Sequence, residues 1–359
     1  MVSSKVSLSH YVPEFTIEIN GKETSADVSK NITSITVDQV LNKPNNFSFK
    51  VQDDSKGGRF QWLGHDVFKF GNDVTIHMGY VQNMHKLIEG KIQNIKASFS
   101  KGLAPTFTVE GSDNAYDFLM GKSDPRVFNK KKDSDIVKEI AQIGKTKLTA
   151  VVDETKEVFP KKTKKGEKSY FAFLKELAES NGFEFYLEGR RLFFVKAKRE
   201  QDPMCTLKWE EELINFQPTL NTANLITEVI VRGWDKKRKK LIEAKAKAGS
   251  ETKQEKKKQL SSKIAREIYG DVVKVITDRP VCSVQEAKKI AESELDKASD
   301  KFIKGSAEII GNPEIKTAVC VMLEGLGGWF SGKYYIEKVT HSINSSGYRT
   351  KFEAKRNSL

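Results

Sequence analysis

Apolar and polar residues alternate along the first part of the chain, which is the pattern of half-buried β-strands. In residues 15–19, Phe and Ile alternate with Thr and Glu, and Asn20-Gly21 then supply the residues of a tight type I′ turn. Short strands at this density predict a small β-barrel or sandwich over residues 1–112. Further runs of the same kind are residues 32–37, 47–51, 74–78, 87–99 and 107–109.

A helical period replaces the alternation over residues 113–203. Asp133-Ser134 and Ser169 can cap two helices, of which the first is expected to end at Gly144 and the second at Asn181-Gly182. Residues 183–195 then predict a β-hairpin with a glycine turn, so this part of the chain is expected to be a compact α+β insert. The apolar face of the first helix consists of Ile136, Val137, Ile140 and Ile143.

Strand character returns over residues 204–359, where the first run leads into Arg232-Gly233-Trp234-Asp235. Ser283 and Glu286 have the spacing of a capping box, which predicts a long helix over residues 283–300. This part is expected to be a second small β-barrel. The predicted fold class is therefore α+β and mostly β, with two barrels flanking a helix-hairpin insert. The remaining runs are residues 225–231, 307–310, 319–323, 334–339 and 350–352.

The net charge of +13 is concentrated in two segments. Residues 236–263 have a net charge of +9 and residues 156–168 have +4, so the rest of the chain is neutral. Both segments are of low complexity, which favours solvated loops. A nucleic-acid site would need several aromatic side chains for the bases to stack on, and Phe159 is the only aromatic residue in the two segments.

The lysine-rich segment, residues 236–263, is predicted to be mobile, with residues 243–262 as a solvent-exposed arm that folding does not require. Leu260 is the only large apolar residue after Ile242 in it, which leaves too little surface to offset the entropy of ordering. A helix over residues 243–258 is the alternative, and Gly249-Ser250 argues against it.

Composition limits the class of protein. Hydrophobic residues make up 38% and charged residues 30%, and no apolar run is long enough for a membrane span. The first residues lack the apolar region of a signal peptide. The chain has three cysteines that lie far apart, Cys205, Cys282 and Cys320, and an odd number with this spacing argues against a set of disulfide bonds. They are therefore expected to be buried free thiols of a protein in a reducing cytosol.

The search for catalytic chemistry is negative. None of the five histidines belongs to a metal-binding motif, although His77 and His85 could meet across a hairpin. The run Gly325-Leu326-Gly327-Gly328 lies between two predicted strands, so it is expected to be a turn and not a phosphate loop. Residues 210–212 are three glutamates that indicate a solvated edge. We therefore expect no catalytic residues, no cofactor and no metal site.

Motifs in the last third of the chain recur in a familiar order. They begin with Asp278-Arg279-Pro280-Val281, continue through Gly311-Asn312-Pro313, and are preceded by the strand-end motif Val231-Arg232-Gly233-Trp234-Asp235. In this set the sequence resembles the late-control D family of phage tail proteins, which is similar to the hub portion of the secretion spike protein VgrG. The resemblance spans about residues 110–355. The residues that it marks as structural are Arg232, Gly233, Trp234, Asp235, Gly325, Gly327, Gly332, Tyr334, His341 and Gly347.

The resemblance implies a structural baseplate hub of a contractile tail-like particle. Hubs of this family are trimers whose two tube-like barrels per chain match a six-fold inner tube, and the insert faces a three-fold spike. The implied partners are the inner tail-tube protein, a separate spike protein, baseplate wedge proteins and a cargo or tape-measure protein in the channel. The implied location is the bacterial cytoplasm, followed by incorporation into a particle.

Two other function classes remain as alternatives. One is a nucleic-acid-binding protein that uses the lysine-rich segments, and the other is a tail-associated cell-wall hydrolase, for which no acid-base pair is found. The sequence does not distinguish a phage tail from a bacteriocin or an injection system. It also leaves open whether the lysine-rich segment faces the channel or the exterior.

Overall fold

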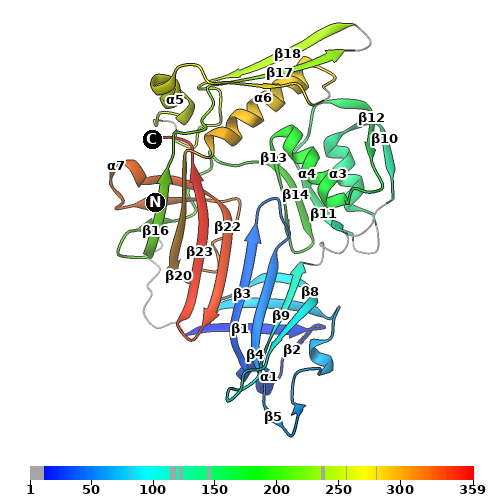
Figure 1. Cartoon of the computed structure of the whole chain (residues 1–359), viewed down its shortest axis with the longest axis vertical. Coiled ribbons are helices and arrows are strands. Elements are labelled where there is room, and N and C mark those ends of the chain that lie inside the picture. The colour runs from blue at the N-terminus through cyan, green and yellow to red at the C-terminus, as the bar shows by residue number, and fades with distance from the viewer. Residues whose placement is uncertain are drawn as a thin grey trace.

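The computed structural model describes residues 12–81, 83–113, 119–120, 124–143, 147–235, 239–255, 257–279 and 281–359. Its main feature is a 13-stranded sheet with the order β16-β20-β23-β22-β3-β4-β9-β8-β7-β1-β2, to which β15 and β21 attach beside β22. Figure 1 shows the amino-terminal half of this sheet below, the carboxy-terminal half beside it, and the insert on the opposite side.

The amino-terminal half of the sheet follows the predicted alternation. Phe47, Phe49 and Val51 point to one side of β4 and are buried, while the residues between them are more exposed. Asn20 and Gly21 both have positive φ angles and turn β1 into the short β2, although the long partner of β1 is β7. The strands are β1 (Pro13–Ile19), β2 (Lys22–Glu23), β3 (Ile32–Val40), β4 (Asn46–Gln52), β7 (Asp73–Tyr80), β8 (Asn83–Ser98) and β9 (Thr106–Asp113). Short elements between them are α1 (Ala26–Lys30), β5 (Ser55–Lys56), β6 (Arg59–Phe60) and the 3-10 helix η1 (Asp66–Phe68).

The carboxy-terminal half has its own apolar core, which includes Phe302, Tyr334 and Phe352. Alternation is also seen here: Ala307 and Ile309 are buried in β20, and every second residue from Tyr348 to Ala354 is buried in β23. The elements are β15 (Thr206–Lys208), β16 (Leu213–Leu220), β20 (Ile303–Ile310), β21 (Cys320–Glu324), α7 (Gly327–Phe330), β22 (Gly332–Asn344) and β23 (Gly347–Arg356).

The two halves are joined strand to strand, so the two barrels that the sequence predicts are not found as closed units among the described strands. Strand β22 pairs antiparallel with β3 from Lys338↔Val40 to Ile343↔Ile35, while β3 pairs with β4 along its other edge. Because each strand has two edges that can form hydrogen bonds, β3 and β22 extend one sheet instead of closing two. Among the described strands the sheet closes into no barrel.

The insert between these halves has the two helices and the hairpin that the sequence predicts. Helix α3 buries Ile136, Val137 and Ile140, and α4 is capped by Ser169 and ends at Gly182, whose φ angle is 66°. The predicted stop at Gly144 lies outside the described residues. The elements are β10 (Arg126–Lys132), α3 (Asp133–Ala141), β11 (Thr149–Val152), β12 (Val158–Lys164), α4 (Tyr170–Asn181), β13 (Phe183–Glu188) and β14 (Arg191–Lys196).

A small three-stranded sheet packs on the long helix α6 (Val284–Ser299), at the top of Figure 1. Ser283 caps α6 by accepting a hydrogen bond from the Glu286 N–H, as predicted, while the Glu286 carboxylate accepts from the Cys282 N–H. Val229, Val231, Ile242 and Ala244 form the sheet face that contacts the helix. The other elements here are β17 (Glu228–Asp235), β18 (Lys240–Lys247), α5 (Ser261–Tyr269) and β19 (Val273–Ile276).

The described residues of both basic segments include strands and buried side chains, which corrects the prediction of solvated loops and of a solvent-exposed arm over residues 243–262. Residues 240–247 form β18 along the whole length of β17, and residues 158–164 form β12 against β10. The composition argument failed because β18 buries small residues, Ala244 and Ala246, between its lysines. Glu251 and Gln254 are also buried, so the segment between β18 and α5 packs against the body of the protein.

Candidate functional site

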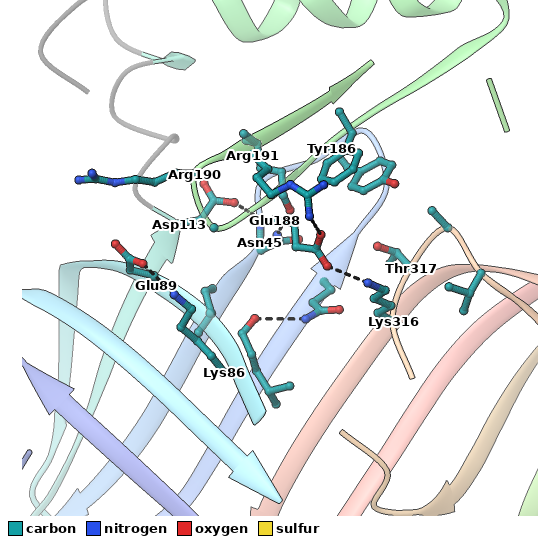
Figure 2. Close-up of a pocket in the computed structure, with 18 residues that line it drawn as sticks. Asn45, Lys86, Glu89, Asp113, Tyr186, Glu188, Arg190, Arg191, Lys316 and Thr317 are labelled. Carbon is teal, nitrogen blue, oxygen red and sulfur yellow. Dashed lines mark hydrogen bonds and ion pairs between the residues drawn. The ribbon is translucent and has the colours of Figure 1, made fainter. Parts of the chain in front are cut away.

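A cleft with a volume of about 630 Å³ opens where the insert meets the main sheet. Figure 2 shows that its walls come from three places: the β3–β4 turn with β8, the β13–β14 hairpin of the insert, and the segment 316–319. The cleft is therefore the junction of parts that lie far apart in the sequence.

Several charged side chains that line this cleft form ion pairs. The Glu188 carboxylate accepts a hydrogen bond from Lys316 Nζ at 2.9 Å and lies 3.7 Å from Arg191 (Figure 2). Lys86 pairs with Glu89 at 3.2 Å. Exposed pairs of this kind contribute about 0–1 kcal/mol each, but the pair of Glu188 with Lys316 connects the insert to the carboxy-terminal half.

Aromatic rings form the insert's side of the cleft. Phe193 stacks on Tyr186 with 4.7 Å between the ring centroids, and the Arg191 guanidinium lies 4.9 Å from the Phe193 centroid. Burial, together with the nearby carboxylates of Glu184 and Glu188, raises the pKa of Tyr186 to about 12. The Tyr186 phenol is therefore neutral at physiological pH and packs as a rigid surface.

Two asparagines of the β3–β4 turn hold the edge of the insert's sheet. The Asn42 N–H donates to the Phe185 carbonyl and the Asn42 side-chain oxygen accepts from the Phe185 N–H, both at 2.9 Å. The Asn45 side chain donates to the Leu187 carbonyl at 3.0 Å. The turn thus takes the place of a neighbouring strand along β13.

Behind the cleft, buried ions connect the insert to the sheet. Arg199 donates two hydrogen bonds to the Asp300 carboxylate, at 2.6 and 2.8 Å, and Lys355 lies 3.0 Å from the same carboxylate. Burial alone would raise the pKa of Asp300, but the charges of Arg199 and Lys355 outweigh it and hold that pKa below its usual value. Lys355 also pairs with Glu337 at 3.1 Å.

Glu184 extends this cluster into the insert. It lies on β13, is almost fully buried, and accepts a hydrogen bond from the Tyr335 hydroxyl of β22. Burial raises the pKa of Glu184 in spite of the nearby charge of Lys355. The arrangement fixes the position of the insert by charged hydrogen bonds that water does not reach.

His341 occupies the other junction, between the two halves of the main sheet. Its Nε2 donates to the Ile315 carbonyl at 3.0 Å and its Nδ1 accepts from the Tyr348 hydroxyl at 2.9 Å. Burial lowers the pKa of His341 to about 4, so the imidazole is neutral. Tyr80 of β7 donates to the Gly311 carbonyl at 2.8 Å beside the Tyr348 ring.

The predicted motif residues do not gather at one site. Arg232, Gly233, Trp234 and Asp235 end β17, where Arg232 pairs with Glu243 at 2.7 Å and Trp234 is 58% exposed. A Cβ atom on Gly233 would lie 2.1 Å from Val281 Cγ2, so only glycine fits against that side chain.

The other motif residues lie at turns and in the carboxy-terminal core. The φ angles are 79° at Gly325, 73° at Gly327, 150° at Gly332 and 96° at Gly347. Tyr334 is fully buried and donates to the Phe330 carbonyl at 2.8 Å. That these residues are structural remains a prediction, which a Gly327 variant tests below.

Sequence reasoning missed the residues of the buried ion cluster. Arg199, Asp300 and Lys355 stand in polar, charged stretches and have no spacing that distinguishes them from surface residues. Glu184 carried one signal, since it interrupts the aromatic run of residues 183–187 on a strand whose neighbours are apolar.

Among the described residues, neither a metal-binding cluster nor a membrane-spanning helix is found. In the part of the chain that the structure describes, no group of three or more His, Cys, Asp or Glu side chains could hold a metal ion. Within the same residues, no helix has both the length and the apolar character that crossing a bilayer needs. The two histidines that could meet across a hairpin, His77 and His85, do lie on the paired strands β7 and β8. They are not directly opposite each other, because His77 pairs with Lys86 and Met78 pairs with His85.

A known protein family has a sequence profile that covers most of this chain. No curated protein matches it. The sequence profile of the Alg8 N-terminal domain matches residues 9–345. The chain belongs to the Alg8 N-terminal domain family. The profile that matches the chain is therefore not that of the late-control D family.

Solved structures place this member of the Alg8 N-terminal domain family among tail proteins by fold. The 43 kDa tail protein of prophage MuSo2 from Shewanella oneidensis superimposes with a TM-score of 0.74 at 14% identity, over 96% of this chain and 98% of that one. The tail protein of Neisseria meningitidis MC58 gives 0.72 at 14% identity, over 96% and 97%. A component of the Escherichia coli type VI secretion system, c3393, gives 0.57 at 11% identity, over 95% and 77%. The chain shares the fold of these tail proteins, which confirms the fold expected from the resemblance at this level.

Proposed function

We propose that this protein is the structural baseplate hub of a contractile tail-like particle. The observation that carries the proposal is the likeness of nearly the whole chain to nearly the whole of a prophage tail protein, over 96% and 98% of the two chains. The insert is included in that match. Its role is mechanical, because the features that unite the molecule are paired strands and buried ion contacts.

The hub is a homotrimer in this proposal. Each chain supplies two sheet halves, within residues 1–112 and 204–359, and three chains supply six halves that meet a six-fold inner tube. The insert, residues 113–203, faces a separate three-fold spike protein. Further partners are baseplate wedge proteins and a cargo or tape-measure protein in the channel. The protein is made in the bacterial cytoplasm and is then built into the particle.

The mass of the purified chain in solution tests this role. Native mass spectrometry is expected to give three times the 40.5 kDa of one chain. Electron microscopy of the same sample is expected to show a ring with an open centre that caps inner-tube assemblies at one end. A particle that stays monomeric at all concentrations and leaves the tube ends bare would contradict the proposal.

A further inference from the structure

Two exposed tryptophan surfaces on this chain carry opposite charges. The first, which we name the acidic corner, consists of Trp209, Glu210, Glu211, Glu324 and Trp329, all exposed. The Trp209 N–H donates to the Glu324 carbonyl at 3.1 Å, and α7, which carries Trp329, begins three residues later. Trp209 and Trp329 are 42% and 66% exposed, so both rings are available for contact.

The second surface, which we name the basic hairpin, is the outer face of β17 and β18. Trp234 and Leu241 face each other across the two strands and are 58% and 61% exposed. Lys239, Lys240 and Lys245 are exposed around them. The opposite face of the same strands is buried against α6, so only this outer face lacks a partner among the described residues.

The two surfaces complement each other in chemistry and lie on different sides of the molecule. Each combines a large aromatic side chain with an excess of one charge. In the acidic corner the glutamates outnumber Lys208, which lies 3.7 Å from Glu211, and on the hairpin the basic residues outnumber Glu243, which pairs with Arg232 and Lys245. Aromatic anchors of this kind supply most of the binding energy at protein interfaces. Figure 1 shows the β17–β18 hairpin projecting to the upper right and α7 at the far left. One copy cannot bring its own two surfaces together without unfolding.

We propose that the basic hairpin of one copy docks on the acidic corner of a second copy. The inference rests on the proposed homotrimer and names the surfaces that would hold it together. Because two different surfaces meet, the contact is head-to-tail, and a head-to-tail contact closes into a ring when the rotation between copies allows it. Trp234 and Leu241 then lie against Trp209 and Trp329, and the lysines lie beside Glu210 and Glu211.

Charge reversal on each surface tests this contact. Glu210→Lys with Glu211→Lys makes the corner basic. Residues 228–247 have a net charge of +5, so Lys239→Glu, Lys240→Glu and Lys245→Glu together bring the hairpin to −1. Each reversal is expected to lower the trimer's association constant at least tenfold in sedimentation velocity, with a larger loss at low salt. The chain that carries all five substitutions restores opposite charges and is expected to recover most of the association.

A matched control reverses two exposed lysines elsewhere, Lys50→Glu with Lys101→Glu, and circular dichroism verifies that every variant is folded. If the wild-type chain is a trimer and each reversal remains as associated as the control, the proposed contact is wrong while the trimer stands. If the wild-type chain is a monomer, the proposed trimer itself fails. If the hairpin reversal leaves the trimer intact and only releases co-purified nucleic acid, the hairpin binds a polyanion and the contact is again overturned.

Discussion

At the scale of single residues, buried polar side chains mark the places where distant parts of the chain meet. Asp300 binds Arg199 and Lys355, Glu184 binds Tyr335, and His341 binds Tyr348 and the Ile315 carbonyl. Each of these groups would be costly to bury alone, and each is satisfied only when two segments are correctly placed. They therefore make the junctions specific as well as stable.

Removing one partner of the buried ion pair is expected to be strongly destabilising. Arg199→Met leaves the Asp300 carboxylate buried with one cation fewer, which costs about 3–5 kcal/mol of unfolding free energy. Arg191→Met is the matched control, because its ion pair with Glu188 is exposed and contributes about 0–1 kcal/mol. Urea unfolding measures the free energy of unfolding of both variants. Equal losses in the two would show that the buried ion cluster does not stabilise the junction.

His341 is expected to make the fold sensitive to mild acid. Its pKa is about 4 in the folded chain against an ordinary value of 6.5, so its contribution is complete above pH 6.5 and is lost as the pH falls toward 4. The lost contribution is about 3 kcal/mol when the shift is converted at 1.36 kcal/mol per pKa unit. His341→Gln does not titrate and is expected to flatten the loss of stability between pH 6.5 and 4. An unchanged pH profile in this variant would assign the acid sensitivity to other groups.

Gly327 is expected to be needed for its backbone conformation alone. Its φ angle is 73° and a Cβ atom there would meet nothing within 4 Å, so Gly327→Val brings strain without a clash. The expected loss of unfolding free energy is about 1 kcal/mol or more. Gly328→Val is the control, since Gly328 has equal space and an ordinary φ angle. A Gly327 variant that folds normally but loses a ligand or an activity would show that the turn is a binding site.

At the scale of elements, the strand β18 shows how composition can mislead. Its sequence is rich in lysine, yet the residues that face α6 are Ile242, Ala244 and Ala246, all of them apolar, and the two alanines are small enough for close packing on the helix. Alternation in a strand sends successive side chains to opposite faces, so a half-lysine strand still buries a complete apolar face. This apolar face of β18 shields the buried side of α6 from solvent.

Deleting residues 245–260 is therefore expected to damage the fold. The deletion removes the end of β18 and the buried side chains of Glu251 and Gln254, and it uncovers part of α6. We expect a lower melting temperature and faster proteolysis within residues 228–299, measured on the chain bridged with Gly-Ser. A bridged chain as stable as the wild type would restore the interpretation of the segment as a dispensable arm.

At the scale of the whole molecule, the continuous sheet makes the two halves one mechanical body. Strand β22 pairs with β3 over six residue pairs, and the buried ions fix the insert to the same sheet. A load on one half is carried to the other through a ladder of backbone hydrogen bonds. This property suits the hub role that we propose for the protein.

The sequence by itself determined the elements that depend on neighbouring residues. The strands of both arms, the helices capped by Ser169 and Ser283, and the hairpin of residues 183–195 all follow from side-chain period and capping groups within a few positions. The family resemblance likewise rested on local motifs, and it predicted the tail-protein fold.

Only the tertiary structure decided which strands pair and which charges meet. One edge of β3 pairs with β22, which follows it by about 300 residues in the chain. The sequence does not predict which strand edges pair, because every backbone offers the same hydrogen-bond donors and acceptors. Arg199, Asp300 and Lys355 look like surface charges in the sequence because burial depends on what packs over them. The lysine-rich strand β18 was missed for the same reason, since its alternating alanines have meaning only once α6 lies against them.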